Sequence, residues 1–157
     1  MILNDYRSQF IELLYNACVA DLERLKKCLV NESVFAYAIF STSGFTGFGT
    51  SACTEHWLDK RVKTLLVDTH LDKLDKEQMQ LYVECNAIEW GYYNNPEFND
   101  FEAINDLALK ITDAECDGEL NGILENGDFD YENYDSYNDF FIKSTTEVLL
   151  KLKDSNY

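Results

Sequence analysis

The amino-acid sequence predicts an α+β fold, in which about four helices pack on a three- to five-stranded, mostly antiparallel sheet. Two patterns carry this prediction. Apolar residues recur at three- and four-residue steps near both ends of the chain, and between them lies an aromatic, β-branched segment followed by glycines. With 157 residues, of which 46% are hydrophobic and 14% aromatic, the chain has the size and composition of one folded domain spanning residues 1–157.

The first half of the chain predicts a helix, a hairpin and a second helix. An apolar stripe indicates a helix over residues 4–29. Residues 33–41, SVFAYAIFS, are apolar on both faces, which predicts a central strand covered on both sides. Closely spaced glycines then indicate a turn, so we expect residues 45–53 to pair back as a second strand. A new apolar stripe predicts a helix over 54–68.

The second half adds one more strand and two helices. Residues 80–86, QLYVECN, alternate well enough to predict a third strand. Pro96 precedes an amphipathic segment that predicts a helix over 97–112, because proline is favoured at helix entrances. A final apolar stripe predicts a helix over 137–153.

The charge of the chain is strongly negative and unevenly spread. Twenty-nine Asp and Glu stand against 13 Lys and Arg, for a net charge of −16. Such a balance argues against binding nucleic acid or an anionic membrane, since both need clustered Lys and Arg. Residues 113–139 hold ten carboxylates and no Lys or Arg, so this segment alone carries −10. A basic protein is therefore the partner that the charge favours.

Cysteine usage and hydropathy predict a cytoplasmic protein. The five cysteines are odd in number and include no CxxC pair, which is typical of free thiols in a reducing compartment. The N-terminus turns polar too soon for a signal peptide, and no apolar run approaches the length of a membrane span.

The acidic, tyrosine-rich run over residues 128–139 (DFDYENYDSYND) is the most unusual feature of the sequence. One interpretation is a solvated loop that leads into the last helix. A second is a recognition surface for a basic protein, because carboxylates steer the approach and tyrosines supply rigid contact area. The predicted contacts of that surface are Asp128, Asp130, Tyr131, Glu132, Tyr134 and Asp135.

Calcium is a third interpretation of the same run. Asp128, Asp130, Glu132 and Asp139 stand at positions 1, 3, 5 and 12 of an EF-hand loop. However, Asn133 occupies the position that requires glycine, and the twelfth ligand is Asp where the longer Glu is expected. We therefore predict no metal site.

Residues 53–56 (CTEH) place Cys53 and His56 at a strand–helix junction, where a nucleophile or a metal site could lie. The sequence offers only one other histidine, and no second pair completes four zinc ligands. A Cys–His nucleophile also needs an orienting third group, which the sequence does not reveal. No catalytic residue and no cofactor are predicted from this junction.

Residues 87–92 (AIEWGY) form a compact polar–aromatic cluster after the predicted third strand. The structural interpretation is a core Trp90 with Glu89 capping a local turn. In the order of its elements and in Ala87-Ile88-Glu89-Trp90-Gly91-Tyr92, the chain resembles the uncharacterised bacterial family called domain of unknown function 4303. Glu89, Trp90 and Tyr92 match the signature of that family, although Cys85-Asn86 replaces its usual Ser-Pro. The resemblance implies an association with bacterial toxin–antitoxin systems, in which small acidic proteins act as immunity factors.

These observations predict a binding protein rather than an enzyme. The preferred hypothesis is a cytoplasmic immunity-type or regulatory protein that masks a basic partner such as a toxin. One alternative is a DNA mimic that inhibits a nucleic-acid-binding protein by imitating phosphates with carboxylates. The other is a small enzyme that uses Glu89 or the Cys53–His56 pair.

Overall fold

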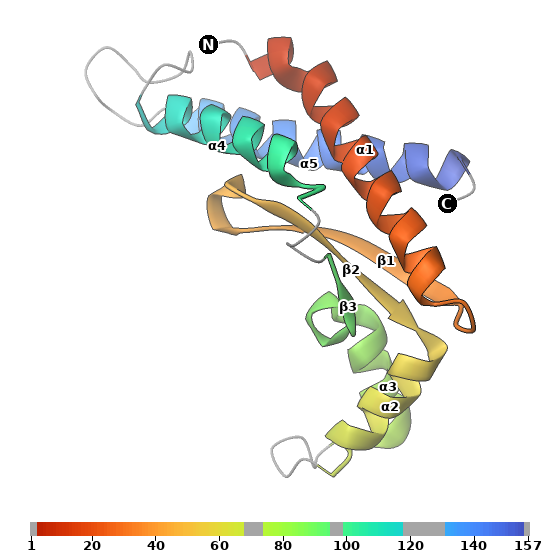
Figure 1. The fold of residues 1–157 in the computed structure, drawn as a ribbon. Coiled ribbons are helices and arrows are strands. Elements are labelled where there is room, and N and C mark those ends of the chain that lie inside the picture. The colour runs from red at the N-terminus through yellow and green to blue at the C-terminus, as the bar shows by residue number, and fades with distance from the viewer. Residues whose placement is uncertain (1–2, 68–73, 95–98, 118–130, 156–157) are drawn as a thin grey trace. The chain divides into compact units, whose positions relative to one another are not determined.

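The computed structural model describes residues 3–67, 74–94, 99–117 and 131–155, with the backbone alone for Asn4 and residues 131–136. These residues form five α-helices, two short 3-10 turns and a three-stranded antiparallel sheet in the order β1-β2-β3, which confirms the predicted α+β class (Figure 1). The elements are α1 (Leu3–Cys28), β1 (Val34–Ser41), η1 (Ser43–Phe45), β2 (Phe48–Thr54), α2 (Glu55–Leu65), α3 (Lys76–Cys85), η2 (Ala87–Glu89), β3 (Tyr92–Tyr93), α4 (Glu102–Cys116) and α5 (Tyr131–Asp154).

The chain divides into two compact units. The helical unit comprises Met1–Glu23, Ser41–Phe48 and Pro96–Tyr157, and it contains most of α1 together with η1, α4 and α5. The sheet unit comprises Arg24–Phe40 and Gly49–Asn95, and it contains nearly all of the sheet together with α2, η2 and α3. Each unit has its own set of buried apolar side chains.

Aromatic rings form the core of the helical unit. Phe141 of α5 is fully buried, and its ring meets the rings of Phe10, Phe45 and Phe48. The Tyr137 hydroxyl donates to the Gly44 carbonyl at 2.7 Å. Edge-to-face contacts such as that of Phe10 with Phe141 add to the stabilisation that burial provides. The last helix is thereby tied to α1 and to the β1–β2 connection.

The sheet unit is organised around β2. In the antiparallel pairing of β2 with β3, Ser51 lies opposite Tyr93 and Ala52 opposite Tyr92. Asn94 extends this short ladder, since its backbone N–H donates to Thr50 at 3.0 Å and its side-chain oxygen accepts from the Thr50 N–H at 2.9 Å. The core of this unit packs α2 and α3 against the sheet. Its buried residues are Cys53, Leu58, Val62, Leu65, Met79, Val83 and Trp90.

The structure corrects the predicted position of the first strand. β1 lies at an edge of the sheet, and Val34, Phe35 and Phe40 are exposed, so it is not a central strand covered on both sides. The central strand is β2, in which every residue is buried. β2 consists mostly of small side chains, so its sequence did not indicate a buried central strand, whereas the aromatic residues of β1 did. The order of the strands in a sheet depends on their neighbours, which a local pattern does not report.

The predicted third strand over residues 80–86 is also wrong, because this segment belongs to α3. Asp75 caps the helix in a capping box with Gln78, which satisfies two backbone N–H groups that no carbonyl of the helix can reach. Met79 and Val83 are buried four residues apart, which is helical spacing. The third strand is instead β3, two residues long.

The remaining boundaries differ by a few residues. The predicted helices over 4–29 and 54–68 correspond to α1 and α2. Within the described part of the chain, α4 begins at Glu102 and α5 at Tyr131, five residues later and six residues earlier than predicted. None of the helices in this part combines the length and the apolar character that crossing a membrane requires.

Candidate functional site

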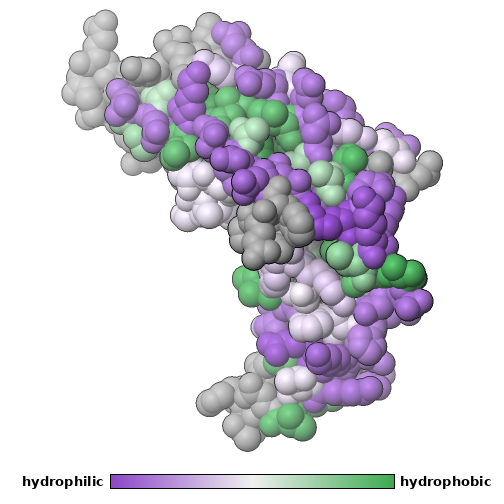
Figure 2. All heavy atoms as spheres, in the orientation of Figure 1, coloured by the Kyte–Doolittle hydropathy of each residue, from purple (hydrophilic) through white to green (hydrophobic). Residues whose placement is uncertain are grey.

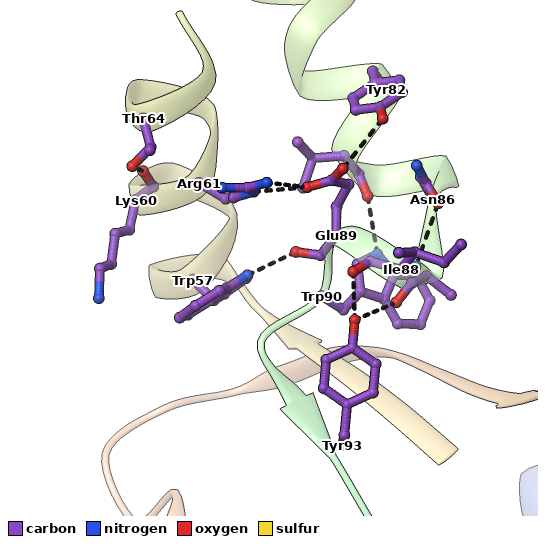
Figure 3. A network of polar contacts seen from close by, with 12 residues as sticks. Trp57, Lys60, Arg61, Thr64, Tyr82, Asn86, Ile88, Glu89, Trp90 and Tyr93 are labelled. Atoms are coloured by element: carbon purple, nitrogen blue, oxygen red, sulfur yellow. Dashed lines mark hydrogen bonds and ion pairs between the residues drawn. The ribbon is translucent and has the colours of Figure 1, made fainter. Parts of the chain in front are cut away.

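The segment that carries Glu89 and Trp90 forms a tight turn between α3 and β3 (Figure 3). The Asn86 side chain accepts a hydrogen bond from the Ile88 N–H at 3.3 Å and so caps the 3-10 turn η2. The Glu89 N–H donates a hydrogen bond to the Asn86 carbonyl at 2.8 Å. Asparagine favours such turns because its side chain competes for nearby backbone groups.

Three aromatic side chains bind the carbonyl groups of this turn and of the helix before it. The Trp57 indole donates to the Glu89 carbonyl at 2.9 Å, and the Trp90 indole donates to the Val83 carbonyl at 2.9 Å. The Tyr93 hydroxyl donates to the Ile88 carbonyl. Every buried indole N–H needs an acceptor, so these contacts satisfy both partners at once. The turn is therefore fixed to α2, α3 and β3.

The Glu89 carboxylate lies at the centre of the network. The Arg61 Nε and Nη2 atoms both lie 2.7 Å from Glu89 Oε2, and the Tyr82 hydroxyl donates to Oε1 at 3.2 Å. The Glu89 side chain is only 14% exposed. A carboxylate that is paired and hydrogen-bonded in this way holds α2 and α3 to the turn. Because its donors are already in place, the arrangement is that of a structural ion pair rather than of a general base.

Tyr93 stands beside this ion pair. Burial raises the pKa of the Tyr93 hydroxyl, the Glu89 charge raises it further, and the Arg61 charge opposes this. The hydroxyl consequently keeps its proton at neutral pH and remains a donor to the turn.

Gly91, which follows Trp90, is required by a close approach to Trp57. A Cβ atom at Gly91 would lie 2.2 Å from Trp57 Cδ2, well inside van der Waals contact. The ammonium of Lys60 lies over the same indole, 5.2 Å from the ring centroid. The indole is thus fixed by a hydrogen bond, a cation and the backbone at Gly91.

Tyr92 does not join Glu89 and Trp90. Its hydroxyl donates to Glu32 Oε2 at 3.0 Å, and the Thr54 hydroxyl donates to the same oxygen at 2.5 Å. Thr54 Oγ1 also accepts from the Trp57 N–H at 3.1 Å, which makes Thr54 the N-cap of α2. The sequence analysis missed Glu32 and Thr54. Their only signal was a threonine immediately before an apolar helical stripe.

Two pKa shifts follow from this second cluster. The hydrogen bond from Thr54 lowers the pKa of Glu32, with further lowering by Tyr92 and by the charge of His56, while burial opposes it. Burial raises the pKa of the Tyr92 hydroxyl, and its bond to Glu32 raises it further. At neutral pH, Glu32 is therefore a carboxylate that accepts hydrogen bonds from the hydroxyl groups of Thr54 and Tyr92.

Cys53 and His56 lie in different environments. Cys53 is fully buried in the core of the sheet unit, and burial raises the pKa of its thiol to about 11, with a smaller contribution from Glu84. His56 is exposed in the first turn of α2. A cysteine nucleophile reacts as the thiolate, which this environment disfavours. Among the residues that the structure describes, no group of three His, Cys, Asp or Glu side chains is spaced to hold a metal ion.

Most residues of the predicted partner surface lie outside the part of the chain that the structure describes. Asp128 and Asp130 lie outside the described residues, and the backbone of Tyr131, Glu132, Tyr134 and Asp135 belongs to α5 with their side chains outside the description. Tyr137, at the end of the acidic run, is buried in the core of the helical unit. Asp139 is exposed and pairs with Lys143 one turn later.

The charge separates between the two units. The helical unit contains 20 Asp and Glu against 5 Lys and Arg, so its net charge is −15. The sheet unit contains 9 against 8, for a net charge of −1. Figure 2 shows hydrophilic side chains along α1 and α4 on the face in view, with apolar atoms between these helices. The acidity of the chain is thus a property of one unit.

The cluster around Glu89 links four elements by hydrogen bonds and an ion pair, and nothing in its geometry distinguishes it from a structural network. Comparison with known proteins adds no assignment. No family model, no curated protein and no solved structure matches this chain.

Proposed function

We propose that this chain is a cytoplasmic binding protein of the immunity or regulatory type, which masks a basic partner protein with its acidic helical unit. The observation that carries the proposal is the separation of charge, with −15 on the helical unit and −1 on the sheet unit. A field concentrated in this way steers a basic partner toward one half of the molecule.

The described part of α4 supports this proposal. Exposed carboxylates stand at helical spacing along α4, at Glu102, Asp106 and Asp113, and at its C-cap, Asp117. The one Lys of the helix, Lys110, places its ammonium over the ring of Tyr6, 5.5 Å from the centroid. No Lys or Arg lies in the last turn of α4 to offset Asp113 and Glu115. Negative side chains at a helix C-terminus add to the negative end of the macrodipole, which costs stability and which a bound cation relieves.

The acidic, tyrosine-rich run would supply the central contacts. Asp128, Asp130 and Glu132 would pair with Lys and Arg of the partner, while Tyr131 and Tyr134 would provide buried anchors beside Asp135. The resemblance to a family met beside toxin systems suggests that the partner is a toxin. Residues 128–135 enter the proposed partner surface from their sequence alone, whereas α4 supports it through the exposed carboxylates that the structure describes.

The alternative functions have less support. A DNA mimic needs carboxylates over much of the surface, whereas the sheet unit is nearly neutral. An enzyme that uses Glu89 would have to release it from Arg61 and Tyr82, and one that uses Cys53 would have to ionise a buried thiol. Masking of a basic protein is therefore the proposal that the described geometry favours.

The test begins with affinity capture from the native cell at low and at moderate salt, followed by identification of the retained proteins by mass spectrometry. We expect a basic protein that is retained at low salt and lost as salt screens the attraction. Association of the purified pair is then measured by stopped-flow. Replacing Asp128, Asp130 and Glu132 by Asn, Asn and Gln should slow association by more than about tenfold.

A matched control removes the same number of charges from the sheet unit, through Glu55→Gln, Asp59→Asn and Glu77→Gln. All three carboxylates are exposed, and this variant should associate at nearly the original rate. Equal rates for the original chain and the helical-unit variant would contradict the proposal. Equal slowing by both variants would show that net charge acts without a defined surface.

A further inference from the structure

A polar groove lies between α1 and α5 in the helical unit. Its volume is about 670 Å³, which falls within the size range of small-molecule sites, about 300–1,000 Å³. Both helices supply charged side chains to its lining. The residues on which its chemistry depends are Arg7, Glu12 and Tyr15 of α1 and Glu147, Lys151 and Asp154 of α5.

Two contacts between the helices frame the groove. Arg7 Nη2 donates to Glu147 Oε2 at 2.8 Å, and the hydroxyl groups of Tyr15 and Ser155 lie 3.1 Å apart. Arg7 and Tyr15 are about two turns apart, as are Glu147 and Ser155, so both walls run in the same direction. Ile11, which is buried midway between Arg7 and Tyr15, gives the lining an apolar part.

The cations of the groove keep donors for a ligand. Arg7 gives Glu147 one of its five N–H groups, and Lys151 Nζ lies 3.7 Å from Glu147 Oε1, which is too long for a hydrogen bond. Neither cation has a further partner within the described part of the chain. Both side chains are about half exposed, at 43% and 53%. A guanidinium fork beside an ammonium suits a carboxylate.

Two exposed carboxylates, Glu12 and Asp154, line the same groove. Among the described residues, neither forms an ion pair. Glu12 comes five residues after Arg7 on one wall, and Asp154 comes three residues after Lys151 on the other. Because the walls run in the same direction, the carboxylates lie about 6 Å further along the groove than the cations. The groove therefore has a cationic end and an anionic end.

This separation of charge selects the ligand. A purely anionic molecule is repelled by the helical unit, whose net charge is −15. A purely cationic molecule would leave the donors of Arg7 and Lys151 without an acceptor. A molecule with one charge of each sign pairs with both ends. The two residues of an extended dipeptide span at most about 7 Å, which matches the spacing of the ends.

We propose that the groove between α1 and α5 binds a zwitterionic ligand of dipeptide size. The carboxylate of the ligand pairs with Arg7 and Lys151, and its ammonium pairs with Glu12 and Asp154. An apolar side chain of the ligand covers Ile11. This inference does not rest on the proposed masking function.

The test is isothermal titration calorimetry of the full chain with glycylleucine and two blocked forms of it. N-acetylglycylleucine lacks the ammonium, and glycylleucinamide lacks the carboxylate. We expect glycylleucine to bind and each blocked form to bind at least about tenfold more weakly, because each loses one charged contact. The proposal is overturned if glycylleucine does not bind, or if either blocked form binds as tightly.

Charge-matched variants locate the ligand. Lys151→Gln and Glu12→Gln should each raise the dissociation constant of glycylleucine by about tenfold or more. Both side chains are exposed, so neither substitution disturbs the core. The controls are Lys153→Gln on α5 and Asp5→Asn on α1, which remove the same charges from exposed positions outside the lining and should leave the constant within about twofold. Equal effects of variants and controls would overturn the proposal.

The two proposals can fail separately. Binding of glycylleucine that depends on Lys151 and Glu12, in a protein that retains no basic partner, would leave the groove standing and refute the masking function. A salt-sensitive basic partner together with a groove that takes no dipeptide would do the reverse.

Discussion

At the scale of single residues, the segment around Glu89 and Trp90 shows how a recognisable motif can serve structure. Trp90 is buried, as the structural interpretation of the sequence expected, and Glu89 binds Arg61 instead of capping the turn itself. The cap comes from Asn86. Tyr92, two residues further along, binds Glu32 through its hydroxyl, and its ring meets Trp57 edge to face. Sequence proximity therefore indicated the network but not its partners, which come from α2, from α3 and from the segment before β1.

Gly91 provides a direct test of this packing. Gly91→Ala should lower the free energy of unfolding by about 1–3 kcal/mol, because the new methyl group overlaps the Trp57 ring, which the Glu89 carbonyl and Lys60 hold in place. The measurement is urea unfolding followed by circular dichroism. Gly47→Ala is the control, since its Cβ would meet Thr42 only at 3.6 Å and should change stability by less than about 0.5 kcal/mol. Equal effects of the two substitutions would refute the close contact.

Glu32 links the stability of the sheet unit to pH. Its pKa is lowered from the ordinary value of 4.5, chiefly by the Thr54 hydroxyl. The folded chain therefore holds the proton of Glu32 less tightly than the unfolded chain does. The stabilisation is fully present above the unfolded pKa of 4.5 and is lost as pH falls through the lower folded pKa.

Replacement of Glu32 by Gln should thus destabilise the protein at neutral pH more than at acid pH. The measurement is the midpoint of urea unfolding at neutral pH and well below pH 4.5, for the original chain and the variant. We expect the difference between their midpoints to shrink at acid pH. Glu77→Gln, which alters an exposed carboxylate of α3, serves as the reference. A difference that stays constant with pH would count against the contact with Thr54.

At the scale of elements, the periodicity of apolar residues identified the long helices, but it missed the elements whose conformation depends on their neighbours in the fold. α1, α2, α4 and α5 follow apolar stripes that core contacts confirm, because a helix that covers a core must show one. α3 is short, and its alternation of Leu81, Val83 and Cys85 imitated a strand although Leu81 and Cys85 are exposed. β3 is too short for any periodic signal, and it exists because β2 offers it a free edge.

The charges of α4 allow a prediction that separates helix stability from binding. Glu102→Gln removes a negative charge from the first turn, and Asp113→Asn removes one from the last turn. The macrodipole favours a carboxylate at the N-terminus and disfavours it at the C-terminus, by about 0.3–1 kcal/mol each. Thermal unfolding should therefore show that Glu102→Gln destabilises the protein and Asp113→Asn stabilises it.

If Asp113 is retained for binding, Asp113→Asn should also weaken the capture of a basic partner while it raises stability. Because the two substitutions remove the same charge from the same helix, each serves as the control of the other. Shifts of the same sign would show that the net charge of the unit outweighs the dipole of α4.

At the scale of the whole molecule, the division of charge between the units has a consequence for folding. The helical unit confines a net charge of −15 within one compact body, and this repulsion opposes its folding. Sodium chloride screens such repulsion, with a Debye length of about 10 Å at about 0.1 M. Moderate salt should therefore raise the melting temperature.

Calorimetry at low and physiological ionic strength measures this increase. Replacing Asp106, Asp113 and Asp117 by Asn should reduce the increase, since it relieves part of the repulsion in advance. The variant with Glu55, Asp59 and Glu77 neutralised should keep the full increase, because those carboxylates lie in the nearly neutral sheet unit. A melting temperature that does not depend on salt would show that the carboxylates of the helical unit are too dispersed to repel one another.

The amino-acid sequence by itself determined the class of the fold, the long helices, the hairpin and the concentration of carboxylates over residues 113–139. These features are local, since each is written in the periodicity or composition of one segment. Only the tertiary structure decided that β2 is the central strand, that Arg61 and Tyr82 bind Glu89, that Cys53 is buried away from His56, and that nearly all the net charge lies in one of two units. Each of these features joins residues from separate segments, and a contact of that kind exists only after the chain has folded.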